Sequence, residues 1–278
     1  MEARITSKKE LPCSAEIKKG LFLCLLISFS ALQVRAEETP PPTYTNIPTS
    51  SRDILSGIES LAESLNFLSA IKSGKKPIDT IALQTALNGV ISLSEKELEN
   101  IEKQLRLLGN LKGDDETTRE EYLDRISTLE NRMQVIKTSA NRDISVDEIL
   151  AIAREVKEWR ETAYAPRVRP MVDFIAVTQN TKAIITAHER LISITKDERK
   201  IRGFFAGSKA GPFLKLLKKA QGEIAQATDM NEEAKRLFAL ARAGDEGDGS
   251  IDTAIEGSNA LVNAAYDDFS AMSKLVKK

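Results

Sequence analysis

The chain has 278 residues, of which 29% are charged and only 5% are aromatic, and its formal net charge at pH 7 is −1. This length is enough to bury one large core or two modest ones. The near-neutral charge excludes a global attraction to nucleic acid, and the shortage of aromatic residues favours long helices over a sheet.

Residues 1–36 have the layout of a secretory signal peptide. Lys18 and Lys19 precede an apolar run, 21–32, and the small residues of a cleavage site follow it, ending at Ala36. The run is short for a membrane span, so the sequence favours a cleaved signal peptide over the alternative, an uncleaved membrane anchor. We therefore expect cleavage after Ala36 and an exported protein that is periplasmic, cell-surface or secreted.

Cleavage of the leader would also change the chemistry of the chain. It would remove six basic and three acidic side chains, which changes the net charge from −1 to −4. Both cysteines, Cys13 and Cys24, lie in the leader. The mature chain would then contain no disulfide, thiol nucleophile or thiolate metal ligand, and its stability would depend on its core.

The N-terminal part of the mature chain predicts a tether and three helices. Residues 37–50 are rich in proline and threonine, which predicts an extended tether. The region 51–140 has apolar residues at alternating spacings of four and three, the pattern of a coiled-coil seam. The first helix starts at Ser51, ends near Ser73-Gly74 and carries Ile54, Ile58, Leu61, Leu65 and Leu68. The second extends from Asp79 to Leu111 and carries Leu87, Ile91, Ser94, Leu98, Ile101, Leu105 and Leu108.

The third helix of this region is expected to start at a capping box of Thr118 and Glu121, after an exposed linker at 113–116. Its seam consists of Tyr122, Ile126, Leu129, Met133, Ile136 and Ala140.

The C-terminal region, 141–278, predicts four further helices, one of which, at 170–202, is central to the others. A capping box of Ser145 and Glu148 opens the fourth helix, and Pro166 and Pro170 predict a turn or kink between it and the central helix. The central helix carries two adjacent stripes, Met171, Phe174, Thr178, Ile185, His188 and Ile192 beside Val177, Ile184 and Leu191. Such breadth predicts neighbours on more than one side.

The last two helices complete the expected fold. One starts at Pro212 and carries Leu217, Ala220, Ile224, Ala227, Ala234 and Phe238; the other carries Ile251, Ile255, Ser258, Val262, Ala265, Phe269, Met272 and Val276. The predicted fold class is all-α, an elongated antiparallel bundle of about seven helices with coiled-coil-like heptad seams. The patterns leave open whether it forms one structural domain or two.

Several features that resemble chemical sites are better explained as ordinary structure. His188, the only histidine, lacks the partner residues of a di-iron or metalloprotease motif, so we expect it in the core or at its boundary. Trp159 is expected to pack. The acidic loop 245–249 has glycines where a calcium loop needs carboxylates, and 203–209 lacks the spacing of a phosphate loop. We expect no catalytic residue, metal or cofactor.

A basic and aromatic stretch, 196–219, is the strongest candidate for a surface that binds a partner. If the loop within it lies at one end of the bundle, its cations and aromatic rings would suit anionic lipid or an acidic polymer. Cations near a helix end that favour its dipole, with phenylalanines that cap the core, explain the same pattern. The candidate residues are Lys196, Arg199, Lys200, Arg202, Phe204, Phe205, Lys209, Phe213, Lys215, Lys218 and Lys219.

The sequence therefore predicts an exported, non-enzymatic helical scaffold or interaction protein of the cell envelope or exterior. Its partner would be another protein or a second copy of the chain, and we expect no nucleic acid. One alternative is a membrane-active helical bundle that contacts anionic lipid. Another is an enzyme that uses carboxylates alone, such as a hydrolase of envelope glycans, for which a facing pair of acids in a deep cleft would be needed.

Overall fold

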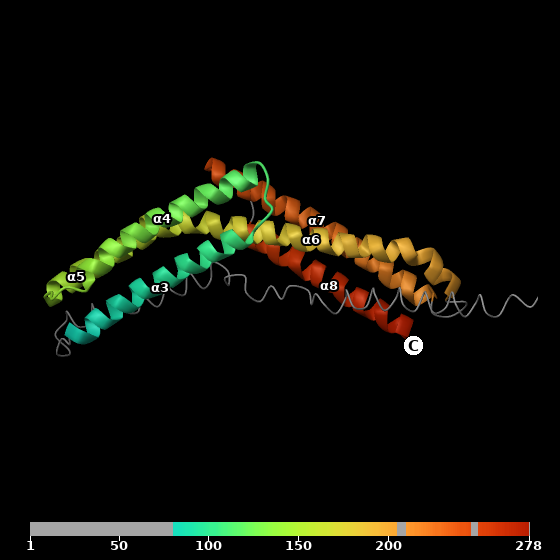
Figure 1. The fold of residues 1–278 in the computed structure, drawn as a ribbon, viewed down its shortest axis with the longest axis horizontal. Helices are drawn as coiled ribbons and strands as arrows, with labels where there is room; N and C mark the ends of the chain where they lie inside the picture. The colour runs from blue at the N-terminus through green and yellow to red at the C-terminus, as the bar shows by residue number, and fades with distance from the viewer. Residues whose placement is uncertain (1–79, 205–209, 246–249, 278) are drawn as a thin grey trace, which may run out of the picture. The chain divides into compact units, whose positions relative to one another are not determined.

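The computed structural model describes residues 80–204, 210–245 and 250–277, and every element in these ranges is a helix (Figure 1). The elements are α3 (Thr80–Leu107), α4 (Asp114–Ala140), α5 (Val146–Trp159), the π-helical turn η2 (Arg160–Tyr164), α6 (Ala165–Phe204), α7 (Ala210–Ala243) and α8 (Ile251–Lys277). The expected leader, tether and first helix lie outside the described residues. The all-α, bundle-like fold is confirmed in these ranges, but the six later helices of the prediction form five continuous ones.

The helices α3 and α4 pair through the two predicted seams. All seven seam residues of the second predicted helix and all six of the third are buried. Gln84, near the start of α3, donates to the carbonyl of Ala140 at the end of α4 at 2.9 Å, and Lys137 forms an ion pair with Glu95 at 2.8 Å. The two helices therefore run in opposite directions.

The starts of α4 and α5 test the two predicted capping boxes. At α5 the prediction is confirmed, because the Ser145 N–H donates to the Glu148 carboxylate at 2.7 Å and the Glu148 N–H donates to Ser145 Oγ at 3.4 Å. At α4 it is wrong, since the helix begins at Asp114, after Gly113 with φ 60°. The acids at 114–116, expected in a linker, lie in the first turn, where they favour the positive end of the helix dipole.

A turn of the chain at Pro166 and Pro170, one of the two outcomes predicted there, is wrong, because α5, η2 and α6 follow one another without an interruption. In the π-helical turn the Ala165 N–H donates to the Arg160 carbonyl, five residues earlier. The helix returns to the α-helical register at Ala165, and Pro166, which has no N–H to donate, is the next residue. Pro170 lies inside α6. The fourth predicted helix and the central helix are therefore one continuous helix.

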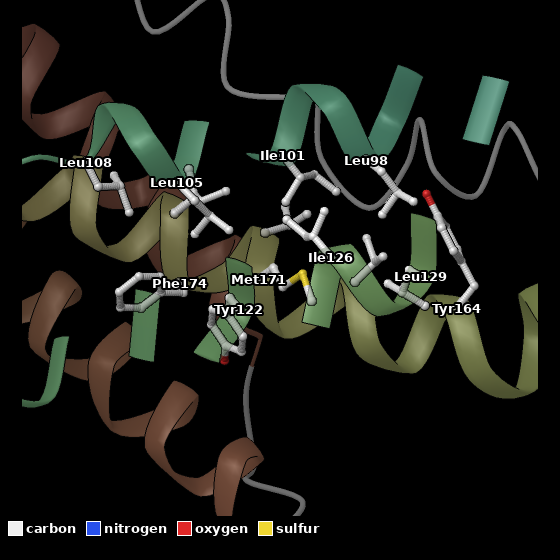
Figure 2. Close-up of a cluster of buried hydrophobic side chains, with 13 residues drawn as sticks. Leu98, Ile101, Leu105, Leu108, Tyr122, Ile126, Leu129, Tyr164, Met171 and Phe174 are labelled. Carbon is white, nitrogen blue, oxygen red and sulfur yellow. The ribbon is translucent and has the colours of Figure 1, made fainter. Parts of the chain in front are cut away.

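The core extends along this continuous helix and is closed by different partners at its two ends. Residues of α3, α4, η2 and the first part of α6 form one cluster, and Figure 2 shows their side chains pointing toward one another. The ring centroids of Tyr122 on α4 and Phe174 on α6 lie 5.6 Å apart, and Phe174 lies 5.9 Å from Phe238 of α7. Farther along α6, Val177 packs with Ala234 of α7 and with residues 254–255 of α8.

A lysine of α6 fixes the end of α3. Lys182 donates to the carbonyls of Leu108 and Gly109, the latter at 3.2 Å, just after the last helical residue of α3. These carbonyls have no partner within the helix, so the ammonium group both satisfies them and favours the negative end of the helix dipole.

Candidate functional site

The predicted basic surface is only partly within the described side chains. Lys196, Lys215 and Lys218 are exposed. The side chains of Arg199, Lys200, Arg202 and Phe204, in the last turns of α6, lie outside the description, as do Phe205 and Lys209 entirely.

Two predicted members of this surface have structural roles. Phe213 is only 2% exposed, because it precedes Leu217 and Ala220 on the buried stripe of α7. Lys219 forms ion pairs of 3.1 Å with both Glu223 of α7 and Asp268 of α8. Hydrogen bonds to these two carboxylates raise the pKa of Lys219. Its ammonium group therefore joins two helices, and Phe213 does not belong to an exposed surface.

The second half of α6 has an exposed apolar side that the sequence did not predict. Ile185 and Ile192 are 52% and 51% exposed, and His188 between them is exposed too. Val177, Ile184 and Leu191 of the neighbouring stripe are buried. The expectation that neighbours cover both stripes is therefore wrong here, as is the expected place of His188 in the core or at its boundary.

A buried polar layer joins α6, α7 and α8. Asn180 Nδ2 donates to Asn231 Oδ1 at 2.8 Å and to Ser258 Oγ at 2.9 Å. Ser258 in turn donates to the carbonyl of Ala227 at 2.8 Å, and Asn231 Nδ2 donates to Thr181 Oγ1 at 2.9 Å. The sequence contains one indication of this layer, because Ser258 is a polar residue at a seam position, between the seam residues Ile255 and Val262. Such a layer is satisfied only when the three helices are in one register.

A second buried polar cluster lies at the π-helical turn. Arg160 is 2% exposed, and its guanidinium group donates to Ser94 Oγ of α3 and, at 3.4 Å, to Glu97. The Tyr164 hydroxyl donates to the same Glu97 carboxylate at 2.9 Å. Burial, with the charge of Glu97, raises the pKa of Tyr164. Trp159, partly buried as expected for a packing residue, lies 5.1 Å from the Tyr164 ring.

One carboxyl group in the core has a strongly raised pKa. Asp173 of α6 is 6% exposed. Burial raises the pKa of Asp173 to about 6; Arg169, one turn earlier, acts against this rise, and Asp252 in the first turn of α8 acts with it. A group that titrates near neutrality in the core connects the stability of the fold to pH.

The described residues contain no group of three or more histidine, cysteine or acidic side chains placed to hold a metal ion. Within the same ranges, none of the helices combines the length and apolar character that crossing a membrane requires. Most of the acidic loop at 245–249 lies outside the description. Comparisons with models of protein families, with characterised proteins and with solved structures found no match.

Proposed function

We propose that the protein is an exported, non-enzymatic and elongated helical scaffold that associates with a second copy of itself through the exposed side of α6. The observation that carries the proposal is the pair of isoleucines, Ile185 and Ile192, each about half exposed on α6, the longest of the helices that the structure describes. Two large apolar side chains spaced seven residues apart share one face of a helix and favour contact with another helix.

This face is complementary to itself when two copies of α6 run in opposite directions. An antiparallel pairing centred between residues 188 and 189 places Ile185 of one helix opposite Ile192 of the other. The same pairing places His188 opposite Glu189, and both of these side chains are exposed. Apolar contacts at both ends and a polar pair between them form an interface that repeats under a two-fold axis.

The buried polar layer supports the proposal because it fixes which side of α6 remains exposed. Rotation of α6 to bury Ile185 and Ile192 would remove Asn180 from its partners on α7 and α8. A buried amide without its hydrogen bonds costs about 1–3 kcal/mol per group. The exposed face is therefore held in place by the interior of the bundle.

The proposal is tested by measuring mass in solution over a range of concentrations, with light scattering or sedimentation velocity. We expect the natural protein to dimerise, and we expect Ile185→Ser with Ile192→Ser to shift it to a monomer. The matched control is Leu107→Ser with Val135→Ser, which removes two large apolar side chains that are 65% and 56% exposed but lie on α3 and α4. This control should leave the dimer intact. A natural protein that stays monomeric, or equal weakening by both variants, would refute it.

A second candidate function, binding to anionic lipid or an acidic envelope polymer, is favoured by one specific observation. Lys215 and Lys218 are exposed in the first turns of α7, and the sequence of the last turns of α6 is basic too. Sedimentation with anionic vesicles at increasing salt should show weaker binding by Lys215→Gln with Lys218→Gln. Lys219 is left unchanged because it pairs with Asp268. Equal sedimentation of variant and natural protein would exclude this surface.

A further inference from the structure

An incompletely covered apolar surface lies at α3 and α5, at some distance along the chain from the isoleucines of α6. Leu93 of α3 is 44% exposed, although it lies between the buried residues Ile91 and Ser94. Val90, Val146 and Leu150 are only partly buried, and Val90 and Val146 pack against the neighbouring core cluster. We call these four residues, Val90 and Leu93 of α3 with Val146 and Leu150 of α5, the Leu93 surface.

The contacts of charged neighbours show that these side chains lie away from α4. On α3, Glu95 pairs with Lys137 of α4, whereas Glu97 binds Arg160, the first residue of η2, directly after α5. Val90 and Leu93 precede Glu97 by seven and four residues, so they lie on the α5 side of α3.

On α5, too, an ion pair shows which side of the helix faces α4. Glu155 pairs with Arg132 of α4, which marks the α4 side of the helix. Leu150 and Val146 precede Glu155 by five and nine residues, which is about 140° and 180° around a helix. The four apolar side chains of the Leu93 surface therefore lie on the sides of α3 and α5 that face away from α4.

We infer that residues 51–72 of the same chain occupy the Leu93 surface as a helix antiparallel to α3 and complete a four-helix arrangement with α3, α4 and α5. This segment, outside the described residues, has the apolar seam Ile54, Ile58, Leu61, Leu65 and Leu68. The inference concerns a contact within one chain and does not depend on the proposed self-association.

The length of the connection selects this segment and this place. Residues 73–79 can span at most about 25 Å when extended, whereas α3 is about 42 Å long. The C-terminal end of the segment must therefore lie within about 25 Å of the start of α3, which places the Leu93 surface within its reach. Leu61 lies as far before the connection as Val90 lies after it, to within one residue, and the same holds for Ile58 and Leu93. In an antiparallel helix, Leu61 would therefore lie beside Val90 and Ile58 beside Leu93.

The test measures how fast a thiol at the Leu93 surface reacts with a soluble labelling reagent. In the full chain with Cys13→Ser and Cys24→Ser, a single cysteine is introduced as Leu93→Cys or, as the control, Leu107→Cys. Leu107 is 65% exposed on the same helix, beyond the stretch that a segment of this length would cover. The difference in exposure between the two leucines explains less than about a two-fold difference in rate, whereas a docked helix should slow Leu93→Cys at least about ten-fold.

Two further variants identify the occupant. Ile58→Asp with Leu61→Asp adds charge to the seam and should raise the labelling rate of Leu93→Cys to within about two-fold of that of Leu107→Cys. Ser56→Asp with Ser60→Asp adds the same charge to the opposite side and should leave the thiol protected. Rapid labelling of Leu93→Cys without these variants, or protection that survives the seam variant, would overturn the inference. Protection that disappears on about hundred-fold dilution would also overturn it, because the occupant would then belong to a second chain.

Discussion

Replacement of Asp173 by asparagine should stabilise the protein at neutral pH and have no such effect in acid. Asp173 is 6% exposed, and burial raises its pKa from 3.8 to about 6. Because the folded state then holds the proton more tightly than the unfolded state, this group stabilises the fold fully below about pH 4. That contribution is lost as pH rises through about 6. A difference of about two pKa units corresponds to about 3 kcal/mol, since each unit is worth 1.36 kcal/mol.

Urea unfolding followed by circular dichroism between about pH 4 and pH 8 measures this difference. We expect Asp173→Asn to exceed the natural protein by up to about 3 kcal/mol at pH 7, and we expect the gap to close toward pH 4. The control is Asp267→Asn, at an exposed position of α8, which should follow the natural protein at every pH. If the natural protein and Asp173→Asn lose or gain stability in parallel, Asp173 is ionised without cost in the fold and the reasoning fails.

Three further changes test other parts of the structure. Arg160→Met should lower the unfolding free energy by about 3–5 kcal/mol, because it leaves the Glu97 carboxylate without its cation. The control, Lys157→Met at a half-exposed position, should lower the unfolding free energy by less than about 0.5 kcal/mol. Ser258→Ala should cost about 1–3 kcal/mol by removing a partner of the buried amide layer, and Ser270→Ala on the exposed side of α8 close to nothing; urea unfolding measures both pairs. Mass spectrometry of the natural protein should give Glu37 as its first residue, and an intact Met1 would refute export with cleavage.

The core of α3 and α4 could be predicted from the sequence because it depends on spacing alone. A helix that pairs along one seam buries every residue at the heptad positions, including Ser94, and the spacing identifies those residues without knowledge of the partner. The start of α4 could not be found in this way, because Gly113 leaves the left-handed region open for a start without a side-chain cap. The sequence offered a capping box at Thr118, but Arg242 of α7 donates to that hydroxyl instead.

The candidate site was harder to predict because exposure depends on where the neighbours of a helix end. In the second half of α6, Val177, Ile184 and Leu191 are buried, whereas Ile185 and Ile192, which share their stripe with His188, are exposed. One polar residue between two isoleucines does not indicate how much of a helix its neighbours cover. The continuity of the helix through the two prolines could not be predicted either. Just before Pro166 the Ala165 N–H donates to the carbonyl five residues earlier, and single-sequence rules do not include this π-helical register.

The two buried polar clusters lie on one continuous helix, and this has a consequence that neither has alone. Arg160 is fixed against Ser94 and Glu97 of α3, and Asn180, farther along, is fixed against Asn231 of α7 and against α8. A shift of this helix by one turn would remove the partners of a buried cation and a buried amide at the same time, although many apolar contacts would be replaced by similar ones. Apolar seams with a repeating period tolerate such shifts, whereas polar clusters do not. The polar residues therefore select one register for a helix whose apolar pattern would permit several, and they keep the face that carries Ile185 and Ile192 in one place.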